Sequence, residues 1–195
     1  MTKAEKTRQF IIEQSAPIFN TKGVAGTAMS DIMEATRLAK GSLYVHFENK
    51  DELSYCAVDH TLDSFVKKIM GAMSKHSTAR GQLYAMLDFL GDPLNPPIIG
   101  GCPMLNFGME ADDTSPVILG KVNKVVESLL RHIADIVRQG IASGEFKAGF
   151  NAVEFATRTF ALVEGGILLS RVSRKRDKMD LIISMIKKEI KAQLK

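Results

Sequence analysis

The stretch TAMSDIMEATRLAKGSLYVHFENKDEL, residues 27–53, decides the fold of this chain. It reads as two short helices joined by a tight connection, with Met29 and Ile32 facing inward from the first helix and Leu43 and Phe47 from the second. The outer face of the second helix is then polar. Two helices of this kind predict a helix-turn-helix unit, whose second helix fits the DNA major groove of about 12 Å width.

Capping signals mark the ends of the neighbouring helices. A preceding helix ends at Gly23, and Thr27 offers a hydroxyl N-cap for the next helix. Asn49 and Glu52 predict a capping box, in which Asn49 accepts from the Glu52 amide while the Glu52 carboxylate reaches back. The long helix that follows has one apolar stripe, made of Val58, Leu62, Phe65, Ile69 and Met73.

The remainder of the chain also carries helical spacing. Further helices are expected over about residues 80–90, 103–112, 115–140 and 151–171, and from Asp177 toward the end. No strand pattern and no internal repeat is present. The sequence therefore predicts an all-α fold of about nine helices.

Composition narrows the class of protein. Hydrophobic residues make up 45% of the chain, which is typical of a folded globular protein. The first six residues lack the apolar core of a signal peptide, and the most apolar stretch, residues 160–169, is interrupted by Glu164 and two glycines. We therefore expect a cytoplasmic protein without a membrane span. No Cys or His has a partner at ligand spacing, so we expect no metal site and no cofactor.

The net charge of +4 does not locate a DNA site. Residues 171–195 contain nine Lys and Arg against three Asp and Glu, a net charge of +6, so the remaining chain has a net charge of −2. A solvated helix face is the favoured interpretation of this tail, and phosphate binding is the alternative.

Residues 41–53, Gly-Ser-Leu-Tyr-x-His-Phe-x-Asn-Lys-x-Glu-Leu, strongly resemble the N-terminal domain of the TetR/AcrR family. The resemblance covers about Arg8 to Leu53, and beyond it only helix number and length agree. It implies a three-helix helix-turn-helix DNA-binding domain over residues 1–50 and a C-terminal helical ligand-binding and dimerisation domain over residues 51–195. Such a protein is a transcription regulator and not an enzyme.

The resemblance also assigns DNA contacts. Tyr44, His46, Lys50 and Thr27 would hold phosphates, and these donors are expected on one rim of the domain. The base-facing candidates lie on the second helix or beside it, where sequence preference would reside. With Arg37 of the connecting turn added, the expected DNA-binding set is Thr27, Ser30, Arg37, Lys40, Gly41, Ser42, Tyr44, His46 and Lys50.

The turn departs from the family pattern. It reads Thr36-Arg37-Leu38-Ala39 where the family usually has Ala-Gly-Val-Ser. If Arg37 adopts a positive φ it carries strain of about 1 kcal/mol or more, and Ala39 has no side chain that could cap the next helix. Arg37 either reaches DNA or is a tolerated turn residue, and both interpretations stay open.

Small residues among large apolar ones near the C-terminus suit a helix–helix interface. The expected interface residues are Ala161, Gly165, Gly166, Ile183, Ile186 and Ile190, with packing inside one subunit as the alternative. The resemblance implies a homodimer joined through the last two long helices. Its two recognition helices would meet half-sites of a palindromic operator about 34–36 Å apart.

Adaptable apolar side chains predict a ligand cavity, with plain core packing as the alternative. The candidates are Met70, Met73, Met86, Phe89, Cys102, Met104, Phe107, Met109 and Phe160. Cys102 follows two glycines at the expected start of a helix, where the helix N-terminus stabilises a thiolate. This Gly-Cys resembles that of family members that respond to electrophiles or oxidants. The alternative is that Cys102 is a small buried apolar residue. Cys56, inside the long helix that follows the helix-turn-helix, is expected to belong to the core.

The sequence thus predicts a repressor whose partners are double-stranded operator DNA, a second copy of the chain, and a small-molecule inducer or thiol-reactive compound. An activator or a ligand-independent DNA binder is the alternative. An enzyme using Cys102 is a remote third class, because nothing places a base and an orienting carboxylate near the thiol. A helical protein-interaction module does not explain the outward Tyr44, His46 and Lys50.

Overall fold

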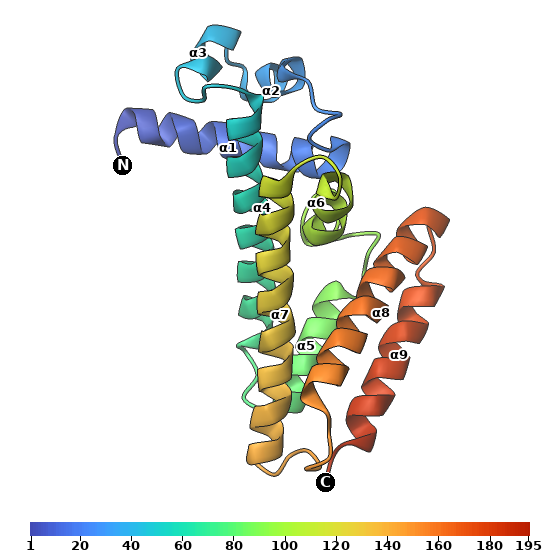
Figure 1. Ribbon diagram of the computed structural model, residues 1–195. Helices are drawn as coiled ribbons and strands as arrows, with labels where there is room; N and C mark the ends of the chain where they lie inside the picture. The colour runs from blue at the N-terminus through green and yellow to red at the C-terminus, as the bar shows by residue number, and fades with distance from the viewer. The chain divides into compact units, whose positions relative to one another are not determined.

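The structure, a computed structural model, describes residues 1–195 as nine helices without a β-strand (Figure 1). The helices are α1 (Lys3–Lys22), α2 (Met29–Thr36), α3 (Lys40–Tyr44), α4 (Lys50–Met73), α5 (Ala79–Leu90), α6 (Pro103–Ala111), α7 (Pro116–Ala142), α8 (Ala152–Ser173) and α9 (Asp177–Ala192). The predicted all-α fold is confirmed. None of the nine helices contains a stretch long and apolar enough to span a membrane.

The chain forms two compact units. The first comprises Met1–Phe65 and Ile98–Lys124, and the second comprises Val66–Pro97 and Val125–Lys195. Helices α4 and α7 each contribute to both units. The functional boundary that we expect after residue 50 stays a prediction.

The core of the first unit is built from the helix-turn-helix region. Ile11 and Phe19 of α1, Ile32 of α2, Leu43 of α3 and Leu53 of α4 are each at most 1% exposed. Burying one such side chain contributes roughly 1.5–3 kcal/mol. The inward face predicted from residues 27–53 is therefore the face that packs α2 and α3 against α1 and α4.

Two capping predictions need correction. Thr27 does not cap α2, because its hydroxyl donates to the Gly23 carbonyl at 2.5 Å; Ala28 is the N-cap, and its amide donates to Asp31 at 3.0 Å. Asn49 does accept from the Glu52 amide, at 2.8 Å. The Glu52 carboxylate, however, accepts from the amide of Glu48 at 2.7 Å rather than from that of Asn49.

The turn between α2 and α3 has the predicted strain. Arg37 adopts φ 56° and ψ 27°, the left-handed region that glycine occupies at lower cost. Ala39 precedes α3 without a side-chain cap. This strained turn is held by the buried residues on both sides of it, Ile32 and Leu43.

The second unit contains the antiparallel pair α8 and α9, which lie side by side in Figure 1. Val163 and Ile167 of α8 and Ile186 and Ile190 of α9 are all at most 5% exposed. A Cβ on Gly166 would lie 2.6 Å from the Met179 sulfur, so glycine permits this close approach. Part of the predicted dimer interface therefore belongs to the core of one subunit.

Two glycines of α7 provide a matched test of the packing around Phe146. A Cβ on Gly140 would lie 2.3 Å from the buried Phe146 ring, whereas one on Gly120 would meet no atom within 4 Å. We expect Gly140→Ala to destabilise the fold by about 1–3 kcal/mol, because a filled core has no room for the methyl group. Gly120→Ala should stabilise it by about 0.5–1 kcal/mol, through helix propensity. Equal unfolding midpoints of the two variants in urea would contradict this packing.

Candidate nucleic-acid interface

Helix α3 presents a polar outer face. Lys40, Gly41 and Ser42 are exposed, Tyr44 is 42% exposed, and Leu43 points inward at 1% exposure. The Lys40 ammonium lies 5.9 Å from the centre of the Tyr44 ring, so both side chains occupy the same side of the helix. This face offers hydrogen-bond donors, and the 79% exposed Val45 follows it at the end of the helix.

Three more predicted contact residues accompany this face. Ser30 is exposed in the first turn of α2, Arg37 is exposed in the turn, and His46 is half-buried just after α3. Their side chains have no hydrogen-bond partner within the protein that would prevent contact with a ligand. Their individual roles on DNA stay predictions.

Thr27 and Lys50 are placed differently from the rest of the predicted set. The Thr27 side chain is 1% exposed and hydrogen-bonded within the domain, which opposes the expected phosphate contact of its hydroxyl. The Lys50 ammonium donates to the carbonyls of Val24 and Thr27 at 2.9 and 3.0 Å. Both residues therefore order the α1–α2 loop, residues 23–28.

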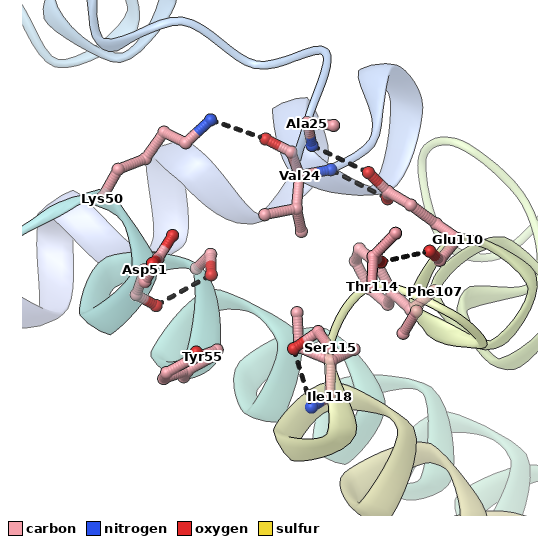
Figure 2. Close-up of a pocket in the computed structure, with 12 residues that line it drawn as sticks. Val24, Ala25, Lys50, Asp51, Tyr55, Phe107, Glu110, Thr114, Ser115 and Ile118 are labelled. Atoms are coloured by element: carbon pink, nitrogen blue, oxygen red, sulfur yellow. Dashed lines mark hydrogen bonds between the residues drawn. The ribbon is translucent and has the colours of Figure 1, made fainter.

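The amides of the same loop are held from α6. The Glu110 carboxylate accepts from the amides of Val24 and Ala25 at 2.9 and 2.7 Å, as Figure 2 shows. We call Glu110 and Lys50 together the loop clamp, because one holds the loop's amides and the other its carbonyls. Sequence reasoning missed Glu110, since it lies more than 80 residues from its partners and no local pattern marks it.

A second set of hydrogen bonds fixes the segment that leads into α6. The amide of the buried Asn20 side chain donates to the Ile99 carbonyl at 2.7 Å, and Asn106 donates to the Asn20 carbonyl at 3.0 Å. Gly100 has φ +97°, and a Cβ there would lie 2.6 Å from the Asn20 carbonyl oxygen. The end of α1 and the start of α6 are therefore closely joined.

Charged groups join α1 to its neighbours. The Arg8 guanidinium donates to Glu52 at 3.0 Å and to the Cys56 sulfur at 3.3 Å, and it lies 4.6 Å from the centre of the Phe47 ring. The Glu48 amide and the Arg8 guanidinium lower the pKa of Glu52. Lys22 lies 2.8 Å from Asp31 and, with the Ala28 amide, lowers the pKa of that carboxyl. Both carboxylates thus stay ionised further into the acid range.

A cavity of about 240 Å³ lies next to the loop clamp (Figure 2). It has an apolar floor and a polar rim, and both clamp residues line it. The lining residues are Val24, Ala25, Lys50, Asp51, Ser54, Tyr55, Phe107, Glu110, Ala111, Thr114, Ser115 and Ile118. Of the predicted ligand-pocket residues, this cavity includes Phe107.

The other predicted pocket residues have varied surroundings. In the first unit Cys102 and Met104 are buried, but Met109 is 70% exposed and does not line an enclosed cavity. The predicted pocket residues of the second unit are all buried or half-buried: Met70, Met73, Met86, Phe89 and Phe160. The expectation for Met109 is therefore wrong, because α6 turns this side chain to solvent.

The predicted interface residues also divide into two groups. Ala161 is exposed, and a Cβ on Gly165 would meet no atom within 4 Å, whereas Ile183 is half-buried beside Gly91. Gly166, Ile186 and Ile190 are buried within the subunit and are not available to a partner. The expected interface set left out the exposed large apolar side chains on the outer faces of these helices: Val153, Leu168, Leu169, Val172, Leu181 and Met185. Their helical spacing was the available signal.

Comparison with known proteins places this arrangement in a family. Residues 11–54 match the family described as "Bacterial regulatory proteins, tetR family". Residues 79–186 match "Tetracyclin repressor-like, C-terminal domain". The two matches cover the helix-turn-helix and most of the helices that follow it.

Individual proteins of this family are similar to nearly the whole chain. A TetR transcriptional regulator from Chloroflexus aurantiacus has 34% identity and a TM-score of 0.93, with 100% of this chain and 98% of that one covered. A TetR-family regulator from Cytophaga hutchinsonii has 33% identity and a TM-score of 0.90 at the same coverage. The HTH-type transcriptional repressor DhaR of Mycobacterium sp. (strain GP1) is 23% identical, over 92% of this chain and 89% of its own length. The chain belongs to the TetR family of bacterial transcriptional regulators.

Proposed function

We propose that this chain is a transcriptional repressor that binds a palindromic operator as a homodimer and releases it when a small molecule binds. The observation that carries the proposal is the polar outer face of α3, which exposes Lys40, Ser42 and Tyr44 while Leu43 is buried. A short helix with this face can enter the major groove and present donors to base edges.

Names of relatives support repression over activation. DhaR is called a repressor, and so is the probable acrEF/envCD operon repressor of Escherichia coli, which is 46% identical over 54 residues. A regulator with this helix-turn-helix represses when its operator overlaps a promoter. An activator, the alternative, would raise transcription from the same DNA.

Selection of bound sequences from random DNA tests this function. We expect the purified protein to enrich an inverted repeat with half-sites about one helical turn apart, or a multiple of it. Transcription from a promoter that carries the repeat should then fall when the protein is added. Failure to enrich any sequence would contradict the proposal, and increased transcription would favour the activator.

The outer face of α3 gives the first functional prediction. Lys40→Ala or Ser42→Ala should relax preference at one or two base positions and cost about 1–3 kcal/mol on the selected operator. Tyr44→Phe should weaken binding to all sequences by a similar factor, because a lost phosphate contact carries no sequence information. Fluorescence anisotropy on operator and scrambled DNA measures both effects, with Lys124→Ala as the control for loss of an exposed charge on α7. A uniform loss of affinity for Lys40→Ala would show that it contacts only backbone.

An exposed apolar surface supports the dimer. On α8 the exposed side chains Val153, Ala161, Leu168 and Val172 follow helical spacing, and Gly165 lies open between them. On α9, Leu181 and Met185 are 58% and 52% exposed. Contiguous apolar surface on a folded protein is typical of an interface, and most homo-oligomers are twofold symmetric. We therefore assign the dimer contact to the outer faces of α8 and α9.

Substitutions on this surface test the dimer without disturbing the core. Leu168→Glu and Gly165→Phe should produce monomers that lose tight operator binding, because one half-site alone forfeits bivalent docking. Val117→Glu changes an apolar side chain on α7 that is 48% exposed and should leave the dimer intact. Light scattering measures the mass, and a dimeric Leu168→Glu variant would place the interface elsewhere.

The exposure of the two cysteines bears on whether the effector is a non-covalent ligand or a thiol-reactive electrophile. Cys102 is the N-cap of α6, as the sequence predicts, but it is 4% exposed, and buried thiols react poorly. This supports a non-covalent ligand over an electrophile. Contrary to the expectation that it belongs to the core, Cys56 is half-buried beside Arg8 and is the more accessible thiol.

Thiol chemistry can be followed directly. We expect a thiol-reactive quinone to modify Cys56 before Cys102, as read by mass spectrometry, because reagent reaches the more exposed sulfur first. The Cys56→Ser and Cys102→Ser variants separate the consequences for operator binding. Release that persists in Cys56→Ser and disappears in Cys102→Ser would reinstate Cys102 as an electrophile sensor.

A further inference from the structure

We propose that the cavity next to the loop clamp is a binding site for a small organic cation, an ammonium group attached to an apolar body. This site is formed entirely within the first unit, between the start of α4, helix α6 and the first turn of α7 (Figure 2). Binding at this site is independent of the proposed function. Only its effect on operator affinity depends on that function.

The size and floor of the cavity suit an apolar body. Its volume of about 240 Å³ exceeds the roughly 150 Å³ of an apolar protein cavity that accepts benzene. Phe107, Ala111 and Ile118 form the packed wall behind it at no more than 3% exposure, and the apolar surface open to a ligand comes from the half-buried Val24 and Tyr55. A substituted phenyl ring fits this space and this surface.

The rim of the cavity suits a positive charge. The carboxylate of Asp51 makes no hydrogen bond or ion pair within the protein, and neither does the hydroxyl of Tyr55, one turn later on the same face of α4. Glu110 adds a second carboxylate, while the single cation, Lys50, already donates to two carbonyls. Two carboxylates and an aromatic ring around one site are the groups that recognise an ammonium.

Occupancy would act on the loop clamp. An ammonium ion at the rim attracts the Glu110 carboxylate, which then competes less well for the amides of Val24 and Ala25. It also repels the Lys50 ammonium, which holds the carbonyls on the other side of the loop. Both effects loosen the connection that leads into α2, so a bound cation lowers affinity for the operator.

Three probes that share a phenyl ring and differ in end charge test the site. They are 2-phenylethylammonium, 2-phenylethanol and 3-phenylpropionate, titrated by calorimetry into the full-length protein without DNA. We expect the cation to bind with a Kd on the order of 1 mM and the other two to bind more weakly. Asp51→Asn should weaken binding of the cation by about fivefold. Asp63→Asn removes an exposed carboxylate from α4 outside the cavity and should leave the Kd unchanged.

A variant of the aromatic rim residue and an assay of operator release complete the test. Tyr55→Leu retains apolar bulk but removes the aromatic ring, and it should also weaken cation binding, with thermal unfolding confirming that both variants fold. In a separate assay the cation should release operator DNA from wild type at concentrations that leave Asp51→Asn bound. Equal binding of the three probes, equal Kd values for Asp51→Asn and Asp63→Asn, or no binding of the cation at about 10 mM would each overturn the proposal. Binding without operator release would keep the site and remove its link to the proposed function.

Discussion

The hydrogen bonds of Glu110 to the amides of Val24 and Ala25 decide how the helix-turn-helix is presented. A loop of six residues would otherwise join α1 to α2 with unpaired amides and considerable freedom. With Lys50 holding the carbonyls, the loop is fixed from both sides by α6 and α4. Hydrogen bonds to charged groups are the stronger kind, about 1.5–3 kcal/mol each before solvent screening. The clamp therefore restricts the loop to one conformation and sets the start of α2.

The same α6 that carries Glu110 is also joined to α1 through Asn20 and Asn106. A displacement of α6 would therefore change the loop and the end of α1 together. Since α2 follows the loop and α3 follows α2 through the strained Arg37 turn, the recognition surface depends on this contact. Helix α8 has two faces with different surroundings. Gly166 permits close packing on α9, while Gly165 and Leu168 lie on the open face that we assign to a partner.

Much of this fold was predictable from local sequence signals. Helical spacing located the helix-turn-helix and α8, and the departure from the family's turn glycine identified Arg37 as the residue that is strained at a positive φ. Long-range contacts were not predictable. Thr27 looks like an N-cap but bonds to Gly23, and nothing near Glu110 indicates that its partners lie in the α1–α2 loop. The interface residues were ambiguous for the same reason, because spacing alone does not distinguish the α8 face that meets α9 from the face that meets solvent.

Hydrogen exchange at the amides of Val24 and Ala25 tests the central claim that Glu110 orders this loop. These amides lie in a connecting loop, so without the carboxylate they have no partner and exchange close to the rate of an open chain. We predict that both are protected in wild type and that Glu110→Ala accelerates their exchange by about tenfold or more, with weaker operator binding. Glu34→Ala, which removes an exposed carboxylate of α2, should leave their exchange unchanged. Unchanged exchange of Val24 and Ala25 in Glu110→Ala would contradict the account.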